Sequence, residues 1–234
     1  MTSHNRLVKS YDWILFDADD TLFHFDAFGG LRLMFSRYDF EFAQPDYDAF
    51  QAINKPLWVE YQGGAITAQQ LQHKRLQPWA DKLQVPAHEL SRGFLTAMAE
   101  ICTPMDGATT LLNALKGKSR LGIITNGFAE LQQARLERTG LAHHFDVLVI
   151  SEQVGVTKPS REIFDHALTL MGNPVRERVL MVGDNPDADI QGGINAGLHT
   201  CWLNIDSRLA PGDIRPNYQV TSLRELEGLL LGKL

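Results

Sequence analysis

The stretch Trp13-Ile14-Leu15-Phe16-Asp17-Ala18-Asp19-Asp20-Thr21 joins a short apolar run to a group of acids. Four consecutive apolar residues predict a strand that is buried on both faces, as in a parallel sheet. Side chains two apart in an extended chain point the same way, so Asp17 and Asp19 converge while Asp20 points elsewhere. Such a pair suits a nucleophile or metal ligand beside a proton carrier. A polar turn, where Asp is common, is the alternative, and this fragment alone does not decide between them.

Similar apolar runs recur after position 100, at 121–124, 147–150, 179–182 and 200–203. Helical patterns lie between them, from Phe128 to Leu136 and from Glu162 to Leu170, with Gly140 and Gly172 near their ends. Ser222 and Glu225 are spaced as in a capping box that opens a last helix. Alternating strands and helices predict an α/β fold with a Rossmann-like parallel sheet.

The stretch from about 23 to 96 breaks this alternation. It contains no strand-like run, and its apolar positions, such as Leu31, Met34 and Phe35, have helical spacing. Gly63-Gly64 and Pro86 indicate breaks between helices. We therefore expect a discontinuous α/β core domain, residues 1–22 and 97–234, and an inserted helical domain, residues 23–96.

The composition limits which binding partners and which cellular compartment are expected. The 234-residue chain has a net charge of -6 and lacks a basic block that could follow a nucleic-acid backbone. Cys102 and Cys201 are too few for a disulfide scaffold or a cysteine metal cluster. Neither a signal peptide nor an apolar run long enough to span a membrane is found. The expectation is a cytoplasmic protein with no nucleic-acid polymer or membrane as partner; the oligomeric state is not readable.

Polar residues recur where the predicted strands end. They are Thr125-Asn126-Gly127, Lys158-Pro159, and Gly183-Asp184 with Asp189 five positions on. Each has a structural alternative: a helix-capping turn, a solvated lysine, or acids at a helix start. Ligands of open α/β sheets bind outside the carboxyl ends of the strands, where helix N-termini attract phosphate. Because all of these groups fall at that edge, the functional interpretation is favoured.

Together these fragments resemble the haloacid dehalogenase superfamily of phosphohydrolases over the whole chain. The matching motifs are Asp17-Ala18-Asp19-Asp20-Thr21, Ile124-Thr125-Asn126-Gly127, Val154-Gly155-Val156-Thr157-Lys158-Pro159 and Gly183-Asp184-Asn185-Pro186-Asp187-Ala188-Asp189. A helical insertion directly after the first motif is similar to the type-one cap of that superfamily.

The resemblance implies a phosphoryl-transfer mechanism in which two acids have separate tasks. Asp17 would attack phosphorus and become an aspartyl-phosphate. Asp19 would protonate the leaving alkoxide and then take a proton from the hydrolytic water. Thr125 and the amide groups of Asn126 would bind phosphate oxygens, and Lys158 would balance the charge on the phosphoryl group and Asp17.

The same resemblance implies a divalent cation, Mg²⁺ or alternatively Mn²⁺ or another metal. It would be held by Asp17, the backbone carbonyl of Asp19, and Asp184, with Asp189 as a supporting acid. Oxygen ligands of this kind suit Mg²⁺. Dehalogenases of the superfamily lack the acid at the position of Asp19, and sugar-phosphate mutases typically differ at Asp20-Thr21. The motifs therefore favour a phosphoric monoester hydrolase.

Longer stretches are similar to bacterial pyrimidine 5'-nucleotidases: residues 13–19, 54–59, 124–128 and 132–140. This likeness implies nucleoside monophosphates such as dUMP, dTMP and UMP as substrates. The alternatives are a phosphatase for a small organic phosphate, such as phosphoglycolate or a sugar phosphate, and a phosphate-sensing binding protein. The amide, cation and rings of Asn54 to Gln62 are candidates for substrate contact, although helix packing is the stronger interpretation for Leu57 and Trp58.

Overall fold

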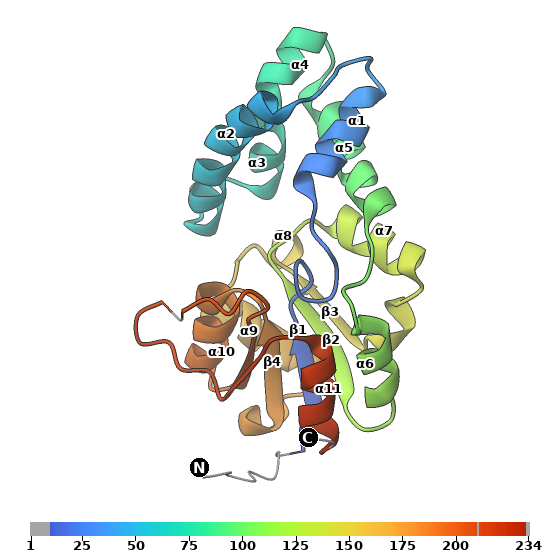
Figure 1. Cartoon of the computed structure of the whole chain (residues 1–234). Coiled ribbons are helices and arrows are strands. Elements are labelled where there is room, and N and C mark those ends of the chain that lie inside the picture. The colour runs from blue at the N-terminus through green and yellow to red at the C-terminus, as the bar shows by residue number, and fades with distance from the viewer. Residues whose placement is uncertain (1–9, 210, 233–234) are drawn as a thin grey trace. The chain divides into compact units, whose positions relative to one another are not determined.

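The computed structural model describes residues 10–209 and 211–232, and these fold into two compact units (Figure 1). One unit, here called the α/β unit, contains the chain up to His24, Pro104–Asn126 and the chain from Leu141 onward. The other, the helical unit, contains Phe25–Thr103 and Gly127–Gly140. Among the described helices, none is long and apolar enough to cross a membrane.

The α/β unit is built on a six-stranded sheet with the order β3-β2-β1-β4-β5-β6, in which all neighbouring strands are parallel. Its strands are β1 (Trp13–Phe16), β2 (Arg120–Thr125), β3 (Val147–Ile150), β4 (Val179–Gly183), β5 (His199–Leu203) and β6 (Tyr218–Val220). Its helices are α6 (Ala108–Leu115), α8 (Ser151–Val154), α9 (Arg161–Leu170), α10 (Gly192–Asn195) and α11 (Leu223–Leu231), with short turns η1 (Ala142–His144), η2 (Arg176–Arg178) and η3 (Pro186–Gln191).

The central strand is buried because both faces of the sheet are covered. Trp13 and Leu15 share a hydrophobic cluster with Ile163 and Phe164 of α9. The alternate residues Ile14 and Phe16 point to the opposite face and are equally buried. A strand covered in this way must be apolar throughout, which explains the run of four apolar residues.

The helical unit contains α1 (Ala27–Ser36), α2 (Gln44–Gln62), α3 (Ala68–Lys74), α4 (Gln77–Leu83), α5 (Ala87–Ile101) and α7 (Ala129–Thr139). Its core is rich in aromatic rings, with Phe35 stacked on Phe42 at 4.8 Å between ring centroids. Thr67 caps α3 through its side chain, and Gly63 follows the end of α2. Helix α5 follows directly after Pro86.

The predicted α/β fold is confirmed, as are five strands and the helical character of the inserted stretch. The sequence did not predict β6, a three-residue edge strand with an exposed Gln219 at its centre. The predicted last helix is α11, where the Ser222 side chain accepts a hydrogen bond from the Glu225 amide at 3.1 Å. Helix α7 packs with α5 in the helical unit, whereas the sequence placed it in the core; the predicted domain boundaries stay a prediction.

Candidate active site

The loop after β1 turns sharply and presents the first two acids. Asp17 continues the strand ladder, because its amide donates to the Val182 carbonyl at 2.8 Å. Asp20 has a φ of 53°, in the left-handed region, and its amide donates to the Phe23 carbonyl at 2.8 Å. This turn leaves Asp17 buried and Asp19 half-buried, so the two acids have different access to solvent.

Lys158 is the charged centre of the site. Its Nζ atom donates to Asp17 Oδ1 at 2.6 Å, to Asp189 Oδ1 at 2.6 Å and to the Ile124 carbonyl at 2.8 Å. The residue is only 1% exposed. A buried ammonium is tolerated only when its protons are paired, and three acceptors satisfy all three. This lysine is therefore no solvated loop residue.

Asn126 fixes the position of Lys158 from the neighbouring strand end. Its side-chain oxygen accepts from the Lys158 amide at 2.7 Å, and its side-chain nitrogen donates to the Lys158 carbonyl at 2.8 Å. Thr125, the last residue of β2, is 1% exposed. The Asn126 side chain thus clamps the lysine loop, and phosphate binding by Thr125 and Asn126 stays a prediction.

The turn after β4 carries the remaining acids. Asn185 accepts from the amides of Asp187 and Ala188, both at 3.0 Å, and opens the π-helical turn η3 that contains Asp189. Both Asp189 oxygens are engaged, Oδ1 by Lys158 and Oδ2 by the Asn185 amide at 3.0 Å. A Cβ on Gly183 would lie 2.2 Å from Asp189 Oδ2, so glycine is required for this close approach.

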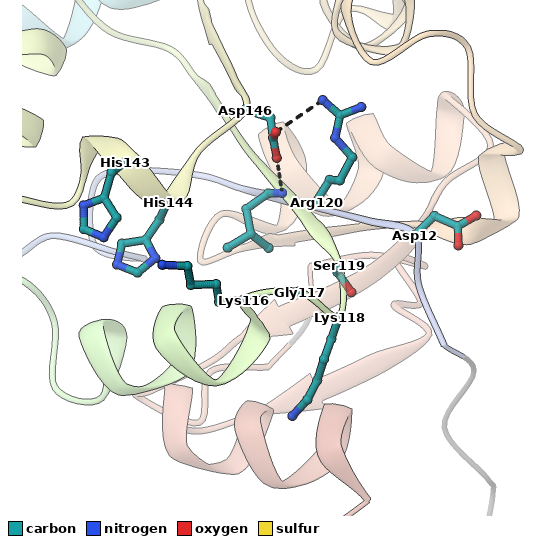
Figure 2. Close-up of a pocket in the computed structure, with 10 residues that line it drawn as sticks. Asp12, Lys116, Gly117, Lys118, Ser119, Arg120, His143, His144 and Asp146 are labelled. Atoms are coloured by element: carbon teal, nitrogen blue, oxygen red, sulfur yellow. Dashed lines mark hydrogen bonds and ion pairs between the residues drawn. The ribbon is translucent and has the colours of Figure 1, made fainter.

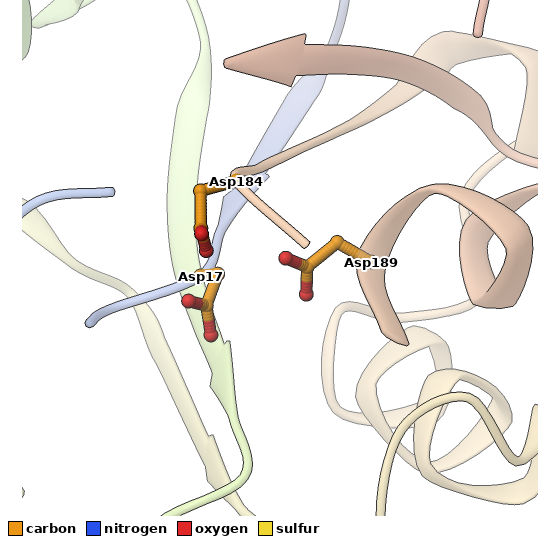
Figure 3. A group of neighbouring side chains, drawn as sticks. All are labelled: Asp17, Asp184 and Asp189. Carbon is orange, nitrogen blue, oxygen red and sulfur yellow. The ribbon is translucent and has the colours of Figure 1, made fainter. Parts of the chain in front are cut away.

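Carboxylate oxygens of Asp17, Asp184 and Asp189 lie within 4.8 Å of one another (Figure 3). Three carboxylates face one ammonium, Lys158, and one guanidinium, Arg208, whose Nη2 lies 3.7 Å from Asp184 Oδ2, so negative charge is in excess. An all-oxygen donor set is the kind that hard divalent cations prefer. The residues therefore fit a cation site. Both Asp189 oxygens already accept hydrogen bonds, and the roles of Asp17 and Asp184 as ligands and of Asp189 as supporting acid stay predictions.

The electrostatics show the same excess of negative charge. Burial, reinforced by Asp189 and Asp19, raises the pKa of Asp17 to about 8 against the opposing effect of Lys158. Burial and the nearby Asp189 and Asp20 raise the pKa of Asp184 to about 7. Burial by itself would lower the pKa of Lys158. The nearby carboxylates of Asp17 and Asp189 outweigh this effect and raise that pKa above its ordinary value. A bound cation would favour the ionised form of both raised acids.

Three contacts around Asp184 were not predicted from the sequence. The Thr21 hydroxyl accepts from the Asp184 amide at 3.1 Å, and the Trp202 indole donates to the Asp184 carbonyl at 2.9 Å. Arg208 donates to the same carbonyl at 3.0 Å. Trp202 and Arg208 carry no motif and come from the chain around β5, so no sequence signal identified them. Thr21 stands within a motif, but its partner could not be read from spacing.

The structure thus brings together Asp17, Lys158, Asp184 and Asp189, with Asn126 holding Lys158.

A separate pocket of about 380 Å³ lies at the N-terminal ends of the strands (Figure 2). It is lined by residues just before β1, β2 and β3, including Asp12, Lys116 and His144, and by the first two residues of β2. Ligands of parallel α/β sheets bind at the carboxyl ends. This pocket lies near the opposite ends and is not part of the acid site.

Residues 11–197 match the family model described as haloacid dehalogenase-like hydrolase. The chain belongs to this hydrolase family. It is 60% identical over 220 residues to the pyrimidine 5'-nucleotidase YjjG of Escherichia coli, covering 94% of this chain and 98% of that protein. It is 30% identical over 221 residues to the pyrimidine 5'-nucleotidase PynA of Streptococcus pneumoniae, covering 92% and 93% of the two chains.

A solved structure of the HAD-hydrolase YfnB from Bacillus subtilis, bound to magnesium, superposes with a TM-score of 0.83 at 30% identity. The match covers 95% of this chain and all of that one, and YfnB shows interdomain movement. The haloacid dehalogenase resemblance seen in the sequence is therefore confirmed.

Proposed function

We propose that this hydrolase is a Mg²⁺-dependent phosphomonoesterase that acts through an aspartyl-phosphate on pyrimidine nucleoside monophosphates such as dUMP, dTMP and UMP. The observation that carries the reaction class is the bridging of Asp17 and Asp189 by the buried Lys158 ammonium, with Asp184 beside them. The substrate class is supported by the 60% identity to a pyrimidine 5'-nucleotidase over nearly the whole chain.

In the first half-reaction, a carboxylate oxygen of Asp17 attacks the phosphorus of the ester. Lys158 binds Oδ1 of Asp17, which leaves Oδ2 for the attack. The P–O bond to the nucleoside breaks, and the leaving alkoxide takes a proton from Asp19. The half-buried Asp19 is suited to this role because it can exchange protons with solvent.

In the second half-reaction, water attacks the phosphorus of the aspartyl-phosphate. Asp19, now ionised, takes a proton from that water, while the P–O bond to Asp17 breaks and inorganic phosphate leaves. Lys158 stays charged throughout and stabilises the extra negative charge on the phosphoryl oxygens. Thr125 and the Asn126 amide groups would bind those oxygens.

Asp17, Asp184 and the backbone carbonyl of Asp19 would hold Mg²⁺, which would supply positive charge against the phosphoryl oxygens. Mn²⁺ or another divalent cation is the alternative. Support comes from the convergence of three carboxylates within 4.8 Å and from the magnesium bound by the related YfnB.

A panel of phosphate esters with MgCl₂ tests the function. We expect dUMP, dTMP and UMP to give the highest kcat/KM. A preference for phosphoglycolate or a sugar phosphate would keep the reaction and overturn the substrate class. Binding of phosphate without turnover of any ester would instead support a phosphate-sensing protein and overturn the enzymatic proposal.

A further inference from the structure

The helical unit buries polar atoms that have no hydrogen-bond partner in the described chain: Asn54 Oδ1, Arg75 Nε and Nη2, and Gln132 Nε2. Arg75 is 4% exposed and Gln132 is 0% exposed. Buried polar groups are nearly always paired, because an unpaired one loses its hydrogen bonds to water without replacement. A bound ligand that forms hydrogen bonds with these atoms would remove this penalty.

Phe128 relates these side chains to one another, because Arg75 contacts its ring and the other two lie one helical turn from Phe128 or from its ring neighbour Trp58. The Arg75 guanidinium carbon lies 5.1 Å from the centroid of the Phe128 ring, and the ring of Trp58 lies 5.7 Å from it. Gln132 is one helical turn after Phe128, and its amide donates to the Phe128 carbonyl at 3.1 Å. Asn54 is one turn before Trp58 on α2, on the same side of that helix. We call these five residues the Phe128 cluster.

The orientation of the Gln132 amide is fixed. Arg135 donates to its Oε1 atom twice, from Nε at 3.0 Å and from Nη2 at 2.6 Å. A rotated amide would turn its NH₂ group toward these donors and lose both bonds. Gln132 must therefore present its NH₂ group as the unpaired end, which makes it a donor to any ligand.

Arg75 is a buried cation without an acid. None of the ion pairs among the described residues involves Arg75, and its guanidinium lies over the rings of Phe94, at 5.0 Å, and Phe128. Burial lowers the pKa of Arg75 to about 9. A buried charge of this kind is costly unless electron-rich atoms face it. Its free Nε and Nη2 protons therefore suit carbonyl oxygens of a ligand.

The unpaired atoms define the chemistry of that ligand. Gln132 and Arg75 supply donors, and Asn54 supplies an acceptor. The edge of a 2,4-dioxopyrimidine offers the complement, two carbonyl oxygens on either side of an N3–H donor. The dianionic phosphoryl group of a phosphate monoester has no donor for Asn54, and cytosine has an amine where uracil has O4. Trp58 and Phe128 add the aromatic surfaces on which bases stack.

We propose that the Phe128 cluster recognises the uracil or thymine base of the substrate, through donors from Arg75 and Gln132 and an acceptor from Asn54. This inference rests on the proposed function and assigns its base preference to the helical unit. Phe128 follows Thr125 by three residues, a covalent span of at most about 11 Å. The chain itself thus links Phe128 of the proposed base site to Thr125, a proposed phosphate ligand.

The test is Gln132→Glu in the full-length protein, assayed with dUMP, dTMP, dCMP and 2-deoxyribose 5-phosphate. The substitution keeps the size of the side chain and the acceptor for Arg135, but it removes the donor. We expect kcat/KM for dUMP and dTMP to fall roughly 10- to 100-fold, mainly through KM. Activity on 2-deoxyribose 5-phosphate, which has no base, should stay within a few fold of the wild type.

Gln133→Glu is the matched control, because Gln133 is the next residue of α7 and is exposed. It adds the same negative charge and should leave kcat/KM for both dUMP and 2-deoxyribose 5-phosphate unchanged. Arg75→Met is the second variant; methionine keeps an apolar contact with the rings and removes the donors. It should also lose dUMP activity selectively, and thermal unfolding will show that each variant is folded.

Equal losses on dUMP and on 2-deoxyribose 5-phosphate in both variants would overturn the proposal, because the cluster would then act on folding or on the sugar phosphate. Wild-type activity on dCMP equal to that on dUMP would also overturn it. If the wild type hydrolyses no pyrimidine nucleotide, the proposed function itself fails. If it hydrolyses dUMP and both variants match it, only the base site is wrong.

Discussion

The two units of this hydrolase differ in how their buried cations are paired. In the α/β unit, Lys158 is fully buried and each of its protons has an acceptor, two of them carboxylates. In the helical unit, Arg75 is equally buried but has no acid in the described structure, and its Nε and Nη2 protons are unpaired. The first arrangement is complete in the protein alone, whereas the second becomes complete only with a ligand.

The difference indicates that the α/β unit carries out the phosphoryl chemistry and that the helical unit selects the ester. A preorganised lysine and its acids are needed for every phosphate ester, because the phosphoryl group is common to all of them. Selection between esters must come from groups that pair only with the right one. Unpaired donors and acceptors discriminate strongly, because a wrong ligand leaves them buried and unsatisfied.

The largest effect is expected for Asp17→Asn. The amide cannot attack phosphorus, so turnover should fall on the order of 10⁴-fold or more. An amide of the same size still accepts from Lys158, so the protein should remain folded. Release of phosphate from dUMP measures the first expectation and circular dichroism the second. Near wild-type turnover would show that Asp17 is not the nucleophile.

The comparison of the two buried cations is tested directly by replacing each with methionine. Lys158→Met leaves Asp17 and Asp189 unpaired in a buried site, and we expect a loss of about 3–5 kcal/mol in unfolding free energy. Arg75→Met removes an unpaired cation and should change stability by no more than about 1 kcal/mol. Urea unfolding of both variants measures the difference. Equal destabilisation would mean that Arg75 is as well paired as Lys158.

Gly183→Ala tests how tightly the acid site is built. The new Cβ would meet Asp189 Oδ2 at 2.2 Å, so the carboxylate must move away from Lys158. We expect a loss of about 1–3 kcal/mol in stability together with reduced activity. Gly63→Ala is the control, since Gly63 is exposed with a φ of -77°. A fully active and stable Gly183→Ala protein would contradict the close packing described here.

The smallest effect concerns pH and the cation. The raised pKa values of Asp17 and Asp184, about 8 and about 7, mean that the folded protein retains protons which the unfolded chain releases near pH 4. Without a cation, these acids therefore lower stability as pH rises from about 4 to 8. Stabilisation by MgCl₂ should grow over the upper part of this range, because binding requires ionised carboxylates.

Thermal unfolding with and without MgCl₂, near pH 6 and near pH 8, measures this change. Asp184→Asn removes one of the raised acids and should abolish most of the difference. An increase in melting temperature that is the same at both pH values would show that neither acid takes part in binding.

Much of the α/β fold could be predicted because its signals are local. A strand covered on both faces must be apolar, and Trp13–Phe16 shows this in four residues. Strand β6 was not predicted because an edge strand of three residues with a polar centre has no such pattern. Helix α7 has a clear local pattern, but its packing on α5 depends on residues that precede it by more than 20 positions.

The sequence by itself determined which groups can do chemistry, because motif residues follow directly after buried strands whose parallel arrangement places them at one edge. Only the tertiary structure decided how those groups are paired. Lys158 reaches Asp17 across 141 positions, and the Asp184 backbone is held by Thr21, Trp202 and Arg208. Likewise, no pattern distinguishes Gln132 from a surface glutamine; its burial and its bonds to Arg135 do. Hydrogen bonding depends on distances between remote atoms, which only the folded chain sets.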